Sequence, residues 1–216
     1  MIEIVLATRN AHKVMEVQRI LDAICDDIKV VDLSAWPDAP DVVEDAPTFA
    51  GNALLKARAL AAHTGLPTMA DDSGICVDAL NGMPGIFSAR WSGSHGKDAD
   101  NLQLLLDQLH DVPDSRRSAQ FTCAVALATP AGDERVVEGV VDGEIVRAPR
   151  GVDGFGYDPI FQPYGYDRTT AELTAEEKDA ISHRGQALRA FVPVAMDLLA
   201  PAQGCGGNCQ CRAAAE

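Results

Sequence analysis

The chain has 216 residues, of which 47% are hydrophobic and 23% are charged, as expected of a globular protein with one domain or two small ones. Its 18 Lys and Arg residues against 32 Asp and Glu residues give a net charge of −14, which argues against non-specific binding to nucleic acid because such binding needs a basic surface. No apolar run is long enough for a membrane span, and the first residues lack the basic segment of a secretory signal. We therefore expect a cytoplasmic protein that binds neither nucleic acid nor a membrane.

The first predicted strand and helix are joined by a polar loop. Residues 2–7 are β-branched and apolar, which predicts a buried strand. Asn10 is a natural N-cap for the helix that follows, so Thr8 and Arg9 lie in the loop and Lys13 lies in the first helical turn. A strand, a polar loop and a helix N-terminus together form a common anion site. A plain capped junction is the alternative that these residues leave open.

An acidic loop comes after the second predicted strand, residues 28–33. Residues 34–47 are rich in Pro and Asp, and no apolar pattern around Glu44 and Asp45 explains why two acidic residues stand there. They are either solvated loop charges or ligands of a metal ion. Thr48 then predicts the cap of a helix that ends before Gly65.

Two adjacent carboxylates interrupt the next apolar segment. A strand that enters at Thr68 and leaves through Ile75 would place Asp71-Asp72-Ser73-Gly74 at a sheet edge or a strand end. Adjacent side chains of a strand point to opposite faces, so the two aspartates are not expected to share one ligand equally. Carboxylates are the preferred ligands of magnesium, which binds through one or two of them together with substrate phosphates. A polar turn is the alternative.

The second half of the chain predicts further helices and strands. A helix is expected to begin at Asp98 or Asp100, and residues 120–128 read as a strand. Asp142-Gly143, between apolar segments, predicts a hairpin. Strands mixed with helices and a hairpin predict an α/β fold with a mixed sheet.

A glycine-rich loop at residues 151–159 carries Phe155 and Tyr157, whose rings either stack on a flat ligand or pack in the core. Thr174 and Glu177 then form a capping box that opens a helix carrying Lys178. The pair that follows, His183 and Arg184, is either exposed on the surface without a function or part of a site.

The cysteines fall into two groups. Cys25, Cys76 and Cys123 stand singly in apolar segments, which is typical of reduced and buried thiols. Residues 201–216 are Gly- and Ala-rich, and we predict that they form a disordered tail behind a domain of residues 1–200. The tail holds three cysteines and no histidine, one ligand short of a closed structural zinc site. These cysteines are Cys205, Cys209 and Cys211.

Taken in order, the motifs resemble the inosine and xanthosine triphosphate pyrophosphatase family over residues 2–199. The segments that carry the resemblance most clearly are Thr8-Arg9-Asn10-x-x-Lys13, Ala70-Asp71-Asp72-Ser73-Gly74, Gly154-Phe155-Gly156-Tyr157-Asp158-Pro159 and Ser182-His183-Arg184-Gly185. The resemblance implies an elongated, two-lobed α/β domain around a long twisted mixed sheet, with a nucleotide cleft between the lobes. It also implies a homodimer.

The implied reaction is magnesium-dependent hydrolysis of ITP, dITP and XTP to the nucleoside monophosphate and pyrophosphate, which removes these nucleotides from the pool. Asp72 would be the water-activating base and a magnesium ligand, with Glu44 as the second ligand and Asp45 as its alternative. Lys56 matches a further lysine near the phosphates, and Arg9 stands where many members carry glycine. The substrate-binding residues implied are Thr8, Asn10, Lys13, Ser73, Phe155, Gly156, Tyr157, Asp158, Lys178, His183 and Arg184.

Two other functions compete with this one. A non-catalytic purine nucleotide sensor would keep the pocket without activating water. A phosphatase of sugars or mononucleotides would prefer monophosphate substrates.

Overall fold

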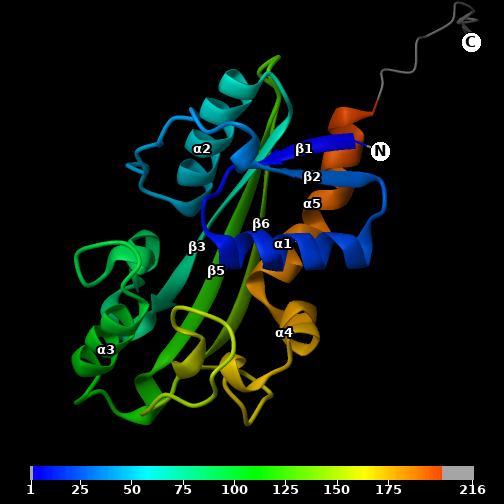
Figure 1. Ribbon diagram of the computed structural model, residues 1–216. Coiled ribbons are helices and arrows are strands. Elements are labelled where there is room, and N and C mark those ends of the chain that lie inside the picture. Colours follow the sequence, from blue (N-terminus) through cyan, green and yellow to red (C-terminus); the bar gives the residue numbers. More distant parts are fainter. Residues whose placement is uncertain (1, 201–216) are drawn as a thin grey trace, which may run out of the picture.

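The computed structural model describes residues 2–200 and consists of a seven-stranded mixed sheet with helices on both faces (Figure 1). The predicted tail, residues 201–216, lies outside the described residues. The strand order is β2-β1-β3-β5-β6-β7, and β4 pairs with β3. The strands are β1 (Ile2–Leu6), β2 (Ile28–Asp32), β3 (Thr68–Val77), β4 (Met83–Pro84), β5 (Ser118–Ala128), β6 (Glu134–Ile145) and β7 (Phe161–Pro163). The helices are α1 (Ala11–Ile24), α2 (Phe49–Thr64), α3 (Asp98–Gln108), α4 (Ala175–Ile181) and α5 (His183–Leu199).

Three long strands, β3, β5 and β6, run the length of the molecule and connect its two lobes (Figure 1). One lobe holds β1, β2, α1, α2 and α5, and the other holds α3, α4 and β7. The predicted α/β class and elongated two-lobed shape are therefore confirmed. Within residues 2–200, no helix combines the length and the apolar character that crossing a bilayer requires.

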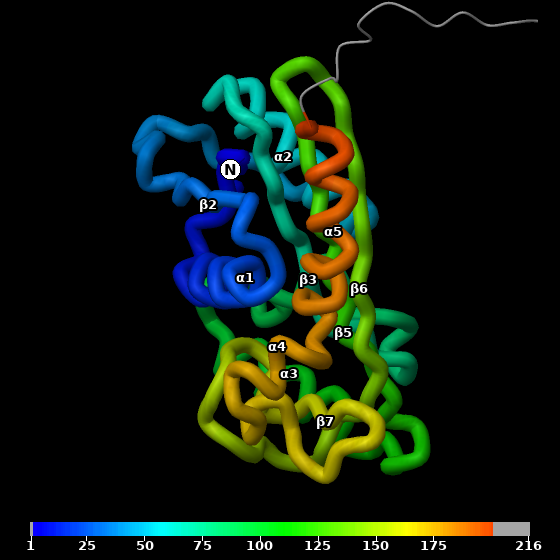
Figure 2. Tube along the Cα trace, turned by 90° about the vertical axis from the view of Figure 1, so that its right-hand side faces the viewer, coloured from blue at the N-terminus to red at the C-terminus, as the bar shows by residue number. Residues whose placement is uncertain are grey.

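The alternation of side chains along the strands divides the core into layers. One cluster packs α1 and α5 on the sheet and includes Met69 and Cys123, while the opposite cluster packs α2 on Ala70 and Ala124. A third cluster in the second lobe joins α3 to the ends of β3 and β5. Figure 2 shows α5 lying along β6, which it contacts extensively.

The aspartate pair lies inside β3, so the predicted strand end and the alternative of a polar turn are both wrong, whereas the predicted sheet edge is confirmed on one side of the strand. The whole of β3 pairs with β5, from Thr68 opposite Ala128 to Val77 opposite Ala119. On the other side of β3, however, β1 pairs only with residues 68–69 and β4 only with residues 76–77. Residues 70–75 therefore have one open edge within a central strand, and side chains rather than a neighbouring strand approach that edge.

The predicted hairpin at Asp142-Gly143 is also wrong, because β6 continues through both residues. The reason for the glycine is a close approach by β7. A Cβ at Gly143 would lie 2.3 Å from the backbone oxygen of Gln162. The actual hairpin joins β5 to β6 through residues 129–133, where the N–H of Thr129 donates to the carbonyl of Asp133.

The predicted helix caps are confirmed. The side chain of Asn10 accepts from the first turn of α1, and Thr48 and Gly65 bound α2 as expected. Thr174 and Glu177 form the capping box of α4. Ser182 caps α5, whereas the sequence leaves open whether it continues α4 or caps a following helix. Among the cysteines of the described residues, all are free thiols, but only Cys123 is fully buried, since Cys25 and Cys76 are half-buried.

Candidate active site

A cavity of about 670 Å³ opens beside the free edge of β3. Its walls come from the loop before α1, the acidic loop before α2, the glycine-rich loop and the N-terminus of α5. Every residue that the resemblance assigns to the site lines this cavity: Thr8, Asn10, Lys13, Glu44, Asp72, Ser73, Phe155, Gly156, Tyr157, Asp158, Lys178, His183 and Arg184.

Asp71 is the buried partner of two cations. Its Oδ2 lies 3.0 Å from Lys13 Nζ and 3.0 Å from Arg184 Nη2. Burial by itself raises the pKa of this carboxyl, but the charges of Lys13, Arg184 and Lys56 outweigh it and hold the pKa far below its ordinary value. Asp71 therefore stays ionised and fixes both cations on one face of β3.

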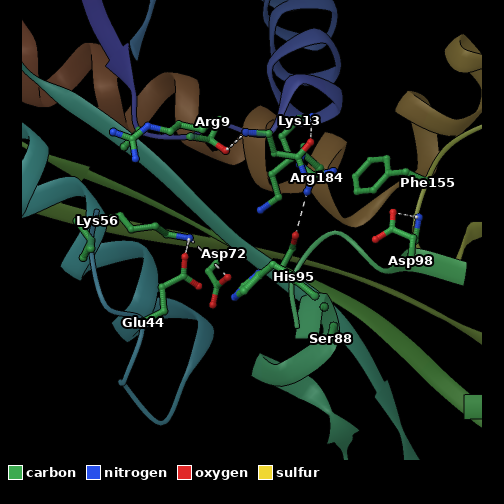
Figure 3. Close-up of a pocket in the computed structure, with 18 of the residues that line it drawn as sticks. Arg9, Lys13, Glu44, Lys56, Asp72, Ser88, His95, Asp98, Phe155 and Arg184 are labelled. Carbon is green, nitrogen blue, oxygen red and sulfur yellow. Dashed lines mark hydrogen bonds and ion pairs between the residues drawn. The ribbon is translucent and has the colours of Figure 1, made fainter. Parts of the chain in front are cut away.

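Asp72 points to the opposite face, as the alternation of a strand requires. Its Oδ2 accepts from Asn52 Nδ2 at 3.1 Å, and its Oδ1 lies 3.6 Å from Lys56 Nζ (Figure 3). Burial raises the pKa of Asp72, and the nearby Glu44 raises it further, although Lys56 and Lys13 oppose both effects. A carboxylate whose pKa is raised in a cleft is suited to accept a proton.

Glu44 and Asp72 converge on a single cation. Lys56 Nζ lies 3.1 Å from Glu44 Oε1 and also contacts Asp72, while its N–H donates to the backbone carbonyl of Asp71 at 2.7 Å. Residues 2–200 contain no group of three or more His, Cys, Asp or Glu side chains that could hold a metal ion. Two carboxylates are nonetheless the set that magnesium uses when phosphates complete its shell. Asp45 is exposed and does not line the cavity.

Arg184 is fully buried, so the surface alternative for residues 183–184 is wrong. Its guanidinium donates to Asp71, to Ser73 Oγ at 2.9 Å and to Glu16 Oε2. Glu16 also lies 3.3 Å from Lys178 Nζ. Sequence reasoning missed Glu16, although an acidic residue beside Val17 on the buried face of α1 is a detectable signal.

The two aromatic residues of the glycine-rich loop have different surroundings. The half-buried ring of Phe155 has Lys178 Nζ at 5.2 Å and the guanidinium carbon of Arg184 at 5.8 Å from its centre. Tyr157 is buried and its hydroxyl donates to the carbonyl of Ser88 at 2.9 Å. Phe155, on which the ring of His12 stacks with centres 5.7 Å apart, is the more exposed of the two rings, whereas Tyr157 packs in the core at the cavity wall.

Asp158 organises this loop. Its Oδ2 accepts from the N–H of Phe155 at 2.9 Å and from Lys178 Nζ at 2.7 Å, and its Oδ1 accepts from Thr170 Oγ1 at 2.8 Å. Because protein donors occupy both oxygens, Asp158 acts on a ligand through Lys178 and the loop rather than directly.

His183 is buried at the N-terminus of α5, where its ring stacks on Phe121 with centres 4.8 Å apart. Burial lowers the pKa of His183 well below its ordinary value, and the charges of Arg184 and Lys178 lower it further. The ring is therefore neutral and offers one N–H donor and one acceptor.

Four further ionisable residues line the cavity without having been assigned a role from sequence: Arg9, Asp41, His95 and Asp98. Asp98, at the start of α3, accepts from the N–H of Gly156 at 3.1 Å and so links the second lobe to the glycine-rich loop (Figure 3). Residues 92–97 form a polar loop before α3, and such a loop has no periodicity that reveals which side chains face a cavity. The arrangement as a whole provides cations, a carboxylate with a raised pKa and an accessible ring, which suits a ligand with phosphates and a flat base.

Comparison with known proteins gives a consistent result. Residues 4–194 match the Ham1 family. A dITP/XTP pyrophosphatase of Streptomyces coelicolor is 60% identical over 199 residues, covering 92% of this chain and 100% of the relative. The crystal structure of a nucleoside-triphosphatase / dITP/XTP pyrophosphatase from Mycobacterium abscessus is 55% identical, with a TM-score of 0.73 and coverage of 89% and 100%. A HAM1 protein from Coxiella burnetii is 45% identical, with a TM-score of 0.82 and coverage of 91% and 100%.

Proposed function

Because the chain belongs to the Ham1 family, we propose that it hydrolyses ITP, dITP and XTP to the nucleoside monophosphate and pyrophosphate. The observation that carries this proposal is that groups suited to phosphates and a ring suited to a base line the same cavity. Cations and Asp72 line its middle and Phe155 lies at one end (Figure 3), while the buried Asp71 holds Lys13 and Arg184 in place without lining the cavity itself. The names of the relatives support the same reaction.

Asp72 is the group we assign as base. Its raised pKa favours uptake of a proton from water, and Asn52 fixes its orientation. Glu44 and Asp72 would hold the magnesium ion, since both side chains already converge on one cation. The bound ion would neutralise charge on the phosphate oxygens. Lys13 and Lys56 add to that stabilisation from opposite faces of β3.

The base of the substrate would stack on Phe155. Lys178 and Arg184 lie beside this ring, and the neutral His183 supplies one further donor. Donors aimed at the 6-oxo group of a deaminated purine would remain unpaired, or oppose an amino group, when adenine enters the pocket. Selection against adenine nucleotides follows from this arrangement.

The biological setting follows from the reaction. We propose a cytoplasmic homodimer that removes deaminated purine nucleotides before they are incorporated into DNA or RNA. The acidic net charge of −14 is consistent with a small-molecule substrate rather than a nucleic acid.

The test is pyrophosphate release from ITP, dITP, XTP, ATP and GTP, each with magnesium and with a chelator. Rapid magnesium-dependent release from the first three, with little from ATP and GTP, is the expected result. ITP binding without any release would favour the sensor instead. Faster release of phosphate from IMP than of pyrophosphate from ITP would favour the monophosphatase.

A further inference from the structure

The cations that line the cavity are all paired, but their partners differ in how firmly they are held. Side chains of the partner carboxylates Asp71, Asp158 and Glu16 are 1%, 4% and 5% exposed. Asp41, the partner of Arg9, has a side chain that is 92% exposed. The pairs are Lys13 with Asp71, Lys56 with Glu44 and Asp72, Lys178 with Asp158 and Glu16, Arg184 with Asp71 and Glu16, and Arg9 with Asp41.

This difference decides which cation can exchange its partner. If Lys178 or Arg184 left its carboxylate for a phosphate, instead of only donating a spare N–H to a base, that carboxylate would remain uncompensated in a buried site, which is strongly unfavourable. If Arg9 does the same, Asp41 simply returns to water, because an ion pair with an exposed group contributes little. Arg9 is therefore the cation that a polyphosphate can take over at the smallest cost.

The position of Arg9 suits the far end of a triphosphate. Figure 3 shows Arg9 and Phe155 toward opposite ends of the cavity, with Lys13 and Asp72 between them. One nitrogen of the Arg9 guanidinium donates to the carbonyl of Ala39 at 2.7 Å, which anchors the group at the cavity wall. A guanidinium has five N–H donors in a planar fork, so donors remain for a phosphate while this anchor is kept.

We propose that Arg9 binds the two distal phosphates, which leave as pyrophosphate, and that Asp41 occupies the same guanidinium when no substrate is bound. This inference rests on the proposed function, because the base must stack on Phe155 and hydrolysis must occur near Asp72. Arg9 is then a specificity-determining residue that favours triphosphates over shorter nucleotides. Asp41 competes with the substrate for it.

The probe is inorganic pyrophosphate, measured by calorimetric binding and by inhibition of ITP turnover in magnesium buffer. Arg9→Gln should weaken pyrophosphate binding by roughly 10- to 100-fold, the loss expected for a hydrogen bond between charged groups. Asp41→Asn should instead tighten it by about 2- to 5-fold, because only a weak surface pair is removed. The double variant should resemble Arg9→Gln.

The opposite signs separate this role from a structural one. If Arg9 only held the acidic loop in place, Asp41→Asn would weaken pyrophosphate binding in the same direction as Arg9→Gln, and that outcome would overturn the proposal. Unchanged binding in Arg9→Gln would also overturn it. The matched control Arg9→Lys keeps the charge without the fork, so its loss should be intermediate.

IMP provides the second control, because it has no distal phosphate. Its affinity should be equal in the wild type, Arg9→Gln and Asp41→Asn, and a parallel loss of IMP affinity would point to a disturbed pocket and refute the proposal. The calorimetric comparison needs no turnover. Failure of the wild type to hydrolyse ITP would thus refute the proposed function while the pyrophosphate data still tested Arg9.

Discussion

Asp71→Asn should destabilise the protein by about 3–5 kcal/mol, the usual cost of removing one partner from a buried ion pair. The magnitude follows from the position of Asp71, whose Oδ2 lies 3.0 Å from both Lys13 Nζ and Arg184 Nη2 in a side chain that is 1% exposed. Arg184 keeps Glu16 as a partner, but Lys13 loses its carboxylate. For a domain of this size, the melting temperature should fall by roughly 6–20 °C.

Asp72→Asn should have the opposite effect on stability. The pKa of Asp72 is raised chiefly by burial, so the native state disfavours the charge that the side chain carries at pH 7. Removing that charge should stabilise the fold by about 0.5–2 kcal/mol, as substitutions of strained functional groups often do. The same change should lower kcat by about 10²- to 10⁴-fold, the usual contribution of a general base, and leave KM largely unchanged.

Both effects are measured by urea unfolding at pH 7, with steady-state pyrophosphate release from ITP as the second assay. The two variants are matched controls for each other, since they make the same chemical change at neighbouring positions. Equal m values would show that the midpoints report stability. An Asp71→Asn variant as stable as the wild type, or an Asp72→Asn variant as unstable as Asp71→Asn, would refute the assignment of opposite environments.

Three more outcomes are expected. The native state lowers the pKa of His183, so on acidification from pH 6.5 to 5 the unfolded chain binds one proton that the native state does not. The free energy of unfolding should therefore fall by up to about 1.4 kcal/mol for each pH unit of acidification. In urea titrations His183→Phe should make the free energy of unfolding less dependent on pH, and an unchanged pH dependence would contradict this role. Gly74→Ala should lower the free energy of unfolding by about 1–3 kcal/mol in thermal melts, since its Cβ would lie 2.4 Å from the carbonyl oxygen of Gly85. An unchanged melting temperature would show that the backbone at Gly85 moves away from Gly74 without loss of stability. Chelation by EDTA should stop turnover of ITP. The melting temperature of the free protein should not change, because Lys56 already neutralises the carboxylates around it. A large fall of the melting temperature on chelation would indicate a structural metal.

Features with a local cause were predictable from sequence. Asn10 and Thr48 cap helices because a short polar side chain just before a helix reaches the free N–H groups two or three residues ahead of it. The hairpin at Asp142-Gly143 failed for the opposite reason. The need for glycine there comes from Gln162 on β7, and no local pattern reports that contact.

The site shows the same division. Its lining residues were predictable because several motifs occur in the same order as in the family that the chain resembles. The pairing of their charges was not, because it depends on contacts between distant segments. Glu16 holds Lys178 and Arg184 across more than 160 positions of sequence. The placement of Asp71 and Asp72 within a strand likewise depends on cations from α1, α2 and α5 that offset their charges.

The open edge of β3 has a consequence for the behaviour of the protein at high concentration. An unpaired strand edge is a template on which another chain can add a strand and begin to aggregate. Here Lys56 occupies the carbonyl of Asp71, and Ser88 accepts from the N–H of Ile75 at 2.9 Å. These side chains block intermolecular pairing at the same gap that admits a small ligand, so entry to the cavity does not expose the sheet to other protein molecules.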